Sequence, residues 1–302
     1  MSGINIDGYI LQGEFSSENA GNSAWGCAIK NGKKYFIKQL KETYPNISYE
    51  EATPFQKDTI EISRIFESRL KRLYSKLKLS DNGNLVVPID FLKKNGHYYV
   101  ITEWIDQTSD FEEIKSFTNY QKNLMMRVLA YSLFGLEKNN VVHSDLKPDN
   151  IRIKETVSGA KTLKIIDFDN GFIQGDYPDA VGGDQIYMSP ELFARMHQEE
   201  NEEEDKYDIT PKSDIFTLGI IFHEILTGDV PKTNSNEIPY IGEAVGRRME
   251  IELDEKLPIE YSGLIEKMLD ISPNSRPDAF SIFKYLKENV DPLNLRYRAV
   301  MR

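Results

Sequence analysis

Short apolar runs separated by turn-forming residues fill much of the first third of the chain, a pattern typical of β-strands. Trp25–Ile29 and Tyr35–Leu40 are two such runs, and an Asn-Gly pair lies between them. Leu85–Phe91 and His97–Ile105 are two more, again with an Asn-Gly pair between them. Asn-Gly between apolar runs favours a tight turn, so each pair of runs is predicted to form a β-hairpin.

The segment between the two predicted hairpins has a different spacing of apolar residues. Apolar residues there recur at spacings of three and four, which places them on one face of a helix. The residues of this face are Ile62, Phe66, Leu70, Leu73 and Leu77. The first third of the chain is therefore predicted to be a small sheet with one helix.

After Asp106 the pattern becomes mainly helical, beginning with Leu124–Leu136. One strand-turn-strand interrupts it, over Asn150–Ile153 and Leu163–Ile166. Ile215–Leu226 is apolar on all sides, which predicts a buried helix at the centre of this second part. A mainly β part followed by a mainly α part indicates the α+β class.

The composition and the net charge limit the kinds of partner and the cellular environment that we expect for this chain. The net charge of -11, without a local basic stripe, argues against nucleic-acid binding. The first residues lack the charged and apolar regions of a signal peptide, and His223 and Glu224 interrupt the longest apolar run, so we expect neither secretion nor a membrane span. A single cysteine, Cys27, excludes an internal disulfide and fits a cytoplasmic protein.

Two polar segments carry the strongest chemical signal. In the first, Val142–Ile151, Asp145 is followed five residues later by Asn150, and the second places Asp167 after the predicted hairpin. Phosphoryl transfer requires magnesium fixed at the phosphates and a carboxylate that orients the attacking hydroxyl. Asp145 is thus a candidate to take the hydroxyl proton, while Asn150 and Asp167 offer oxygen ligands to Mg²⁺. The alternative for either segment alone is a polar turn before a hairpin.

These segments resemble the Hanks-type (eukaryotic-like) serine/threonine protein kinases, including bacterial members, from about residue 9 to about residue 290. The catalytic-loop pattern H-R-D-L-K-P-x-N has Ser144 in the arginine position here, and D-F-G reads Asp167-Phe168-Asp169. Lys147, two residues after Asp145, is typical of serine/threonine kinases rather than tyrosine kinases.

Three later segments extend the resemblance. They are Tyr187-Met-Ser-Pro-Glu191, the buried-helix signature Ser213–Gly219, and Arg276-Pro277. In the family the glutamate and the late arginine pair, so the resemblance implies a Glu191–Arg276 pair, and it implies that Asp214 holds the backbone of the catalytic loop. It also implies one bilobal kinase domain over residues 1–302, with an N-lobe at 1–105, a C-lobe at 106–302 and a C-terminal tail at 291–302.

The resemblance also assigns residues to ATP. Tyr35-Phe-Ile-Lys38 corresponds to V-A-I-K, which makes Lys38 the residue for the α and β phosphates. Its expected partner on the following helix is Glu67, which lies ahead of the leucine run, although Glu61 is closer to Lys38 in sequence.

The resemblance implies further contacts with the nucleotide, but this sequence departs from the family pattern at several of these positions. Gly21 and Ser23 lie in the expected phosphate-covering loop, where Ala20 and Ser23 occupy glycine positions. Phe36 replaces the alanine that faces adenine, which puts the affinity for ATP in question. The backbone of Glu103 to Ile105 should bind adenine after the gatekeeper Thr102. Asp106 and Asp110 are both candidates for the ribose.

The function implied is ATP- and magnesium-dependent phosphorylation of serine and threonine hydroxyls in proteins. A pseudokinase that acts as a binding or scaffolding module is the alternative, suggested by Ser144, Asp169, Phe36 and the glycine-poor loop. A small-molecule kinase is disfavoured by Glu191, Asp214 and Arg276, because such enzymes lack that trio.

Two further expectations concern substrates and control. The acidic run Glu199–Asp205 predicts protein substrates that are basic around the target hydroxyl, although a solvated loop is the plain alternative. Between Asp167 and Met188 the hydroxyl side chains are Tyr177 and Tyr187, without Ser or Thr. With Ser144 in the arginine position as well, activity is predicted not to require phosphorylation of this activation segment.

Overall fold

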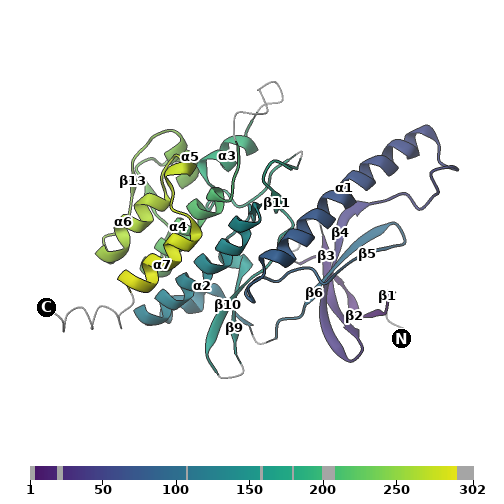
Figure 1. The fold of residues 1–302 in the computed structure, drawn as a ribbon, viewed down its shortest axis with the longest axis horizontal. Coiled ribbons are helices and arrows are strands. Elements are labelled where there is room, and N and C mark those ends of the chain that lie inside the picture. Colours follow the sequence, from purple (N-terminus) through teal and green to yellow (C-terminus); the bar gives the residue numbers. More distant parts are fainter. Residues whose placement is uncertain are drawn as a thin grey trace. The chain divides into compact units, whose positions relative to one another are not determined.

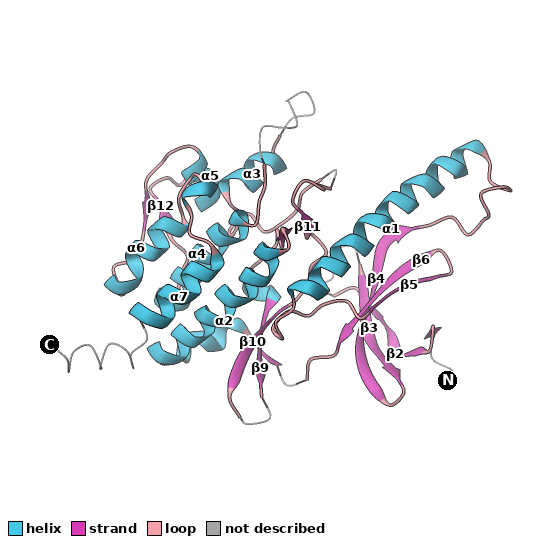
Figure 2. Ribbon diagram, viewed as in Figure 1, coloured by secondary structure: helices cyan, strands magenta, loops and turns pink. Residues whose placement is uncertain are grey.

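The computed structural model describes residues 4–18, 23–106, 108–156, 159–178, 180–198 and 208–290. The chain forms two compact units, the first of residues 1–78 and 86–106, the second of residues 79–85 and 107–302. The first unit holds an antiparallel sheet and a long helix, and the second is mainly helical (Figure 2). The predicted α+β class is confirmed.

The sheet of the first unit has the order β1-β2-β3-β4-β6-β5, with antiparallel neighbours. Its strands are β1 (Asn5–Ile6), β2 (Tyr9–Ser16), β3 (Ala24–Lys30), β4 (Lys33–Thr43), β5 (Asp90–Lys94) and β6 (His97–Glu103). Asn31 and Gly32 have φ values of 52° and 75°, as a tight turn with two left-handed residues requires. Both predicted hairpins are therefore confirmed, although one strand is shorter than expected.

That strand was predicted over Leu85–Phe91, but β5 begins at Asp90. Pro88 explains part of the difference, because proline has no N–H to give to a strand ladder. Leu85 instead forms an isolated bridge with Ile165 in the second unit.

The predicted helix is α1 (Pro54–Ser80). Leu70, Leu73 and Leu77 are buried as expected, with 6%, 2% and 0% exposure. Ile62, predicted on the same buried face, is 67% exposed, so this part of the prediction was wrong. The N-terminal turns of α1 extend past the strands (Figure 1), and at the turn of Ile62 the covered side of the helix carries Ser63, which is 7% exposed, and not Ile62.

One face of the sheet forms an apolar core of its own. Because side chains alternate along a strand, Ile37 of β4 and Ile101 of β6 lie opposite each other on this face. Both are fully buried, together with Leu11 of β2 and Tyr99. Lys38, the next residue after Ile37, therefore points to the other face.

The second unit is built around α4 (Lys212–Thr227), which packs against α2 and α6. All its residues from Ser213 to Ile225 are buried, which confirms the predicted central helix. The other helices are α2 (Asn119–Lys138), α3 (Pro190–Met196), α5 (Ile241–Gly246), α6 (Ile259–Met268) and α7 (Ala279–Asn289), with 3-10 turns η1 (Phe111–Ser116), η2 (Pro148–Asn150) and η4 (Pro273–Ser275).

Short strands complete this unit. They are β7 (Thr108–Ser109), β8 (Val141–Val142), β9 (Ile151–Glu155), β10 (Lys161–Ile165), β11 (Phe172–Ile173), β12 (Lys232–Thr233) and β13 (Ile251–Glu252). The hairpin of β9 and β10 is the predicted strand-turn-strand. It positions the residues before and after it, Asn150 and Asp167, at its open end.

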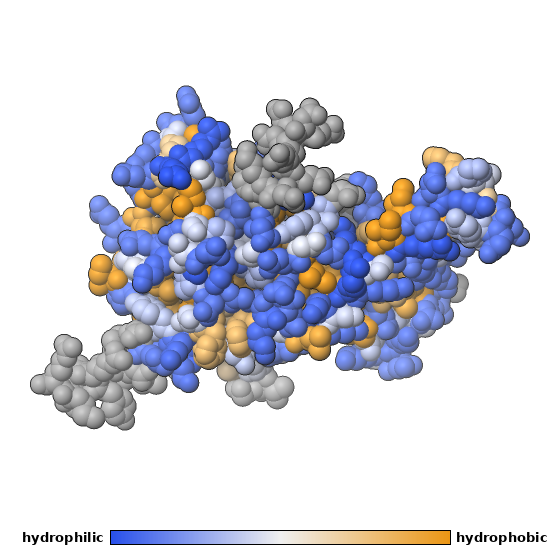
Figure 3. All heavy atoms as spheres, turned by 45° about the horizontal axis from the view of Figure 1, so that its top comes forward, coloured by the Kyte–Doolittle hydropathy of each residue, from blue (hydrophilic) through white to orange (hydrophobic). Residues whose placement is uncertain are grey.

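The surface drawn in Figure 3 is largely hydrophilic, with apolar residues in separate patches. Among the described residues, no helix combines the length and the apolar character needed to cross a bilayer.

Candidate active site

The catalytic loop follows β8 and is fixed by Asp214 of α4. The Asp214 carboxylate accepts hydrogen bonds from the backbone N–H groups of His143 at 2.7 Å and Ser144 at 3.1 Å. Burial raises the pKa of this carboxyl to about 7, and the two N–H donors oppose the shift. The expectation that Asp214 holds this loop is confirmed.

Asp145 is the best-connected carboxylate of the loop. Its Oδ1 accepts a hydrogen bond from the N–H of Asp184 at 3.0 Å and lies 3.3 Å from Nζ of Lys147. Its Oδ2 lies 3.4 Å from the amide nitrogens of Asn150 and Asn170. With the side chain only 13% exposed, these contacts hold the carboxylate in one orientation. A carboxylate fixed in this way can accept a proton from a hydroxyl placed against it.

Asn150 and Asp167 lie at the two ends of the β9–β10 hairpin. The side-chain nitrogen of Asn150 donates to the carbonyl of Asp145 at 2.7 Å, which fixes the amide. Asp167 has a φ of 60°, a left-handed backbone that Asp tolerates and that is common at functional sites. An amide oxygen and a carboxylate are hard ligands, so this pair fits Mg²⁺ held partly by phosphate oxygens. Within the described residues, no group of three or more His, Cys, Asp or Glu side chains offers a complete protein cage for a metal.

The activation segment is attached to the catalytic loop through Ser144. Its hydroxyl donates to the carbonyl of Gly182 at 2.9 Å, and its backbone has a φ of 70°. A Cβ on Gly183 would lie 2.6 Å from the Ser144 carbonyl oxygen, so only glycine permits this approach. With the hydrogen bond from the N–H of Asp184 to Asp145, this contact joins the segment to the loop without a charged side chain at the arginine position.

An ion pair connects the end of the same segment to the part of the second unit just before α7. Nη1 and Nη2 of Arg276 donate to Oε1 and Oε2 of Glu191 at 2.6 and 2.9 Å. The two side chains are 0% and 8% exposed, so this is a buried bidentate pair. The expected Glu191–Arg276 pair is confirmed.

The predicted ATP contacts of the first unit lie along the sheet. Lys38 stands on β4 opposite Trp25 of β3 and Val100 of β6. Phe36 stacks on Trp25 at 5.6 Å between ring centroids, which gives this replacement of the family's alanine an aromatic partner. Ser23 directly precedes β3, and Gly21 lies outside the described residues. Their roles in ATP binding stay predictions.

The segment predicted to bind adenine begins at the end of β6. Glu103 is the last residue of that strand, opposite Tyr35, and Ile105 follows without regular structure. Both candidates for the ribose have side-chain partners. Asp106 accepts from Nε1 of Trp104 at 2.8 Å, and Asp110 from Nη1 of Arg152 at 2.9 Å. Neither contact decides between them.

Glu67 lies on α1, and its carboxylate contacts two residues of the sheet. Oε1 accepts from Nζ of Lys93 and from the hydroxyl of Tyr98 at 3.0 Å. Glu61, the other candidate, is exposed and pairs with Arg64 at 2.6 Å. The pairing of either glutamate with Lys38 stays a prediction.

Several contacts around the site could not be expected from the sequence. The Tyr187 hydroxyl donates to Glu224 of α4 at 2.8 Å, and Thr217 donates to the Tyr187 carbonyl at 2.7 Å. In the sequence, Glu224 is only a polar interruption of an apolar run. The contact of Asn170 with Asp145 likewise had no signal beyond the position of Asn170 after Asp169.

His223 gives α4 a pH-dependent contribution to stability. Its Nε2 accepts from the N–H of Asp254 at 2.9 Å, which leaves Nδ1 to donate to the Asp229 carbonyl at 2.7 Å. Burial lowers the pKa of the imidazole, so the unfolded chain takes up this proton first as the pH falls below about 6.5. The stabilisation is thus complete above that pH and is lost below it.

We expect His223→Gln to be destabilised most at pH 7.5, and the gap between parent and variant to narrow by pH 5.5. Urea unfolding of both proteins at the two pH values measures this. A gap that stays constant would contradict a neutral His223.

Comparison with known proteins gives a consistent result. Residues 55–286 match the family described as protein kinase domain. Calcium-dependent protein kinase 4 of Plasmodium falciparum is 28% identical over 200 residues, which is 64% of this chain and 36% of that protein. Protein kinase kin1 of Schizosaccharomyces pombe is 25% identical over 278 residues, 90% of this chain and 29% of that protein. Serine/threonine-protein kinase atg1 of Dictyostelium discoideum is 27% identical over 260 residues, 78% of this chain and 35% of that protein.

The chain thus spans about a third of the length of these relatives. They are eukaryotic proteins, and the expected likeness to bacterial members stays a prediction. The matched region runs from α1 to α7 and contains Asp145, Asn150, Asp167 and the Glu191–Arg276 pair. The chain belongs to the protein kinase domain family.

Proposed function

We propose that the chain is an active kinase that transfers the γ-phosphoryl group of ATP to serine or threonine hydroxyls of proteins. The observation that carries this proposal is the fixed carboxylate of Asp145, with Lys147 and the amide of Asn150 beside it. A domain kept only for binding has no need of a carboxylate held in this way. The serine/threonine kinases among its relatives support the choice of substrate class.

In the proposed reaction the hydroxyl oxygen forms a bond to the γ-phosphorus, the bond to the bridging oxygen breaks and ADP leaves. Asp145 accepts the hydroxyl proton, and Lys147 stands beside the transferred group. Asn150 and Asp167 hold magnesium, which when bound offsets the negative charge of the phosphates.

The other proposed roles concern ATP itself. Lys38 binds the α and β phosphates and Glu67 is its partner. The backbone at Gly21 and Ser23 covers the phosphates, and the segment from Glu103 to Ile105 binds adenine. From the same resemblance we infer that residues 1–302 form one kinase domain with two lobes that meet at residues 105 and 106. From the composition we infer that the protein acts in the cytoplasm.

We also propose that this activity needs no phosphorylation of the activation segment. In many kinases an arginine before the catalytic Asp binds a phosphate on that segment. Here the Ser144 hydroxyl contacts the Gly182 carbonyl directly, which supplies a neutral contact in place of the charged one. Tyr177 and Tyr187, the hydroxyl side chains between Asp167 and Met188, are both engaged, with Asp208 at 2.5 Å and Glu224 at 2.8 Å.

Phosphatase-treated protein is therefore expected to phosphorylate substrate from the first seconds, without a lag. A time course with and without prior incubation with ATP measures this, and mass spectrometry locates any phosphate. A lag that incubation removes, with phosphate within residues 170–187, would contradict the proposal.

Substrates basic around the target hydroxyl are the finer proposal for specificity. It depends on the charge of Glu199–Asp205, a run that lies outside the described residues.

Incubation with labelled ATP, magnesium and a generic basic protein tests the function. We expect labelled protein from the parent and none from Asp145→Asn, which keeps the size of the side chain but cannot accept the proton. Binding of ATP without transfer would favour a pseudokinase, and transfer only to small molecules would favour the third alternative.

A further inference from the structure

One side of the N-terminal half of α1 carries a row of accessible residues. Three of them are large and apolar: Phe55, Ile62 and Ile65 are 79%, 67% and 70% exposed. Apolar residues that gather in an exposed patch, with charged residues at its edges, commonly mark an interaction surface. We call this row the α1 stripe. Its residues, none of which is buried, are Phe55, Asp58, Ile62, Ile65, Arg69 and Arg72.

The α1 stripe has the spacing of a helix-to-helix interface. Its residues follow one another in alternating steps of three and four, which is the spacing of positions a and d in a coiled coil. Over about five turns, roughly 25 Å, such residues stay on one side of a helix. Their slow drift around the helix is matched when two helices cross at about 20°. The stripe can therefore contact a second helix along its whole length.

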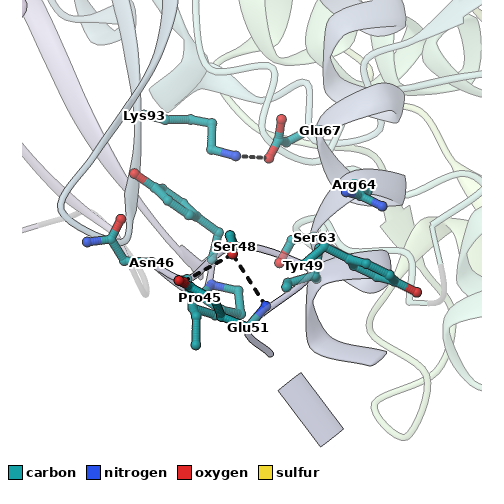
Figure 4. Close-up of a pocket in the computed structure, with 12 residues that line it drawn as sticks. Pro45, Asn46, Ser48, Tyr49, Glu51, Ser63, Arg64, Glu67 and Lys93 are labelled. Carbon is teal, nitrogen blue, oxygen red and sulfur yellow. Dashed lines mark hydrogen bonds and ion pairs between the residues drawn. The ribbon is translucent and has the colours of Figure 1, made fainter. Parts of the chain in front are cut away.

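The opposite flank of α1 faces the loop after β4, within the same chain. Figure 4 shows the pocket between this loop and the helix, which Ser63, Arg64 and Glu67 line from the side of the helix. Arg64 also lies 5.1 Å from the ring centroid of Tyr49 in that loop. The residues of the α1 stripe, all of them described, do not line this pocket. The stripe is thus the side of α1 that remains accessible to a partner.

The start of the helix is held in place by a reciprocal cap. The N–H of Thr53 donates to Oε1 of Gln56 at 2.9 Å, and the N–H of Gln56 donates to Oγ1 of Thr53 at 3.4 Å. These bonds satisfy donors that the first turn of a helix leaves without partners. They fix the backbone that presents Phe55 and Asp58.

The charges of the α1 stripe are arranged symmetrically about its two isoleucines. Asp58 lies four residues before Ile62, and Arg69 lies four residues after Ile65. Neither Asp58 nor Arg69 forms an ion pair with another described residue. A partner that fits the stripe therefore offers a cation at one end, an anion at the other and apolar side chains between them.

A second copy of the same helix, running in the opposite direction, has this arrangement. In an antiparallel pair centred between Ile62 and Ile65, each Ile62 contacts the second copy's Ile65. The same symmetry places each Asp58 against the second copy's Arg69, with opposite charges in contact. At the ends of the stripe it places Phe55 against the second copy's Arg72, where a guanidinium can stack on the ring.

A parallel pair of the same helices does not fit. It would place Asp58 against the second copy's Asp58, and Arg69 against the second copy's Arg69, and like charges in contact disfavour an interface. The antiparallel pair has a two-fold axis, so each copy contributes the same surface and the contact closes at two chains. The stripe is complementary to itself in the antiparallel direction.

We propose that two copies of this chain associate through the α1 stripe, as an antiparallel helix pair with its two-fold axis between Ile62 and Ile65. The proposal goes beyond the proposed function and does not rest on it, since no contact in the pair involves ATP, a substrate or the catalytic loop. The interface is small, so we expect a dissociation constant on the order of 10 μM.

Reversal of charge tests the pairing. Asp58→Arg brings two arginines together at each end of the interface, and Arg69→Asp brings two aspartates together. Each variant is expected to dimerise about tenfold more weakly than the parent. The double variant Asp58→Arg with Arg69→Asp restores opposite charges, and its dissociation constant should return to within about threefold of the parent's. Sedimentation equilibrium of the full chains measures these constants, and a double variant as weak as the single ones would overturn the antiparallel pairing.

Ile62→Ser tests the apolar centre. It removes two isoleucines from the proposed interface, so we expect dimerisation to weaken by about tenfold or more. Ile259→Ser on α6 is the matched control, because Ile259 is 86% exposed and lies outside the α1 stripe, and it should leave the dissociation constant unchanged. A parent that stays monomeric at about 100 μM, or a dimer that Ile62→Ser weakens no more than Ile259→Ser does, would overturn the proposal.

Discussion

Asp167→Ala is expected to abolish phosphoryl transfer, with a loss of roughly a thousandfold or more, while the protein stays folded. Charge stabilisation by a bound metal contributes several kcal/mol to such a reaction, and a carboxylate ligand holds that metal. The side chain of Asp167 is exposed, so it contributes little to the core. Steady-state kinetics with magnesium and a thermal melt measure the two parts of the expectation.

Asp169→Ala is the matched control, because it removes an exposed carboxylate of the same segment that carries no proposed ligand role. It should keep most of the activity. Retained activity in Asp167→Ala would contradict the magnesium assignment, and a large fall in its melting temperature would show that Asp167 is structural.

Arg276→Ala is expected to lower the free energy of unfolding by about 3–5 kcal/mol, since it leaves Glu191 buried without its countercharge. The loss also includes the hydrogen bonds that Arg276 donates to the carbonyls of Asp270 at 2.8 Å and Lys212 at 2.8 Å. Urea unfolding measures the change.

Arg247→Ala is the control for exposed charge, because Arg247 pairs with Glu243 but is itself 63% exposed. We expect it to cost less than about 1 kcal/mol. If Arg276→Ala unfolds at nearly the parent's urea concentration, the buried pair does not stabilise the fold. The double variant Glu191→Gln with Arg276→Ala should recover part of the loss, because no uncompensated carboxylate remains.

Much of the fold was predictable because local patterns and tertiary packing agree. The Asn-Gly turns specify hairpins by backbone geometry alone, and the continuous apolar run of α4 has no stable place except the interior. The prediction for Ile62 was wrong because spacings of three and four residues do not fix which side of a helix packs, and the packed side at this turn carries Ser63. The strand at Leu85 failed because its partner, Ile165, is distant in sequence.

Some contacts of the candidate site could also be predicted from the sequence, and others could not. Residues in fixed-spacing motifs, such as Asp145 with Asn150 and Glu191 with Arg276, come together in the second unit as expected. Contacts that depend on a single polar side chain were not predictable. Neither the hydroxyl of Ser144 nor the ammonium of Lys93 has a sequence pattern that indicates Gly182 or Glu67 as its partner.

The assignment of residues 79–85 to the second unit determines how the chain can be divided. The polypeptide crosses between the units three times, after Lys78, before Val86 and after Asp106. Asn82 donates to the carbonyl of Tyr131 at 2.7 Å, and the carbonyl of Asn84 accepts from the N–H of Ile165 at 2.8 Å. A fragment that ends at Asp106 therefore contains residues 79–85 but lacks the residues of the second unit that they contact. No single cut yields either unit whole, and cleavage at the exposed Asp106 alone leaves the halves joined by these contacts.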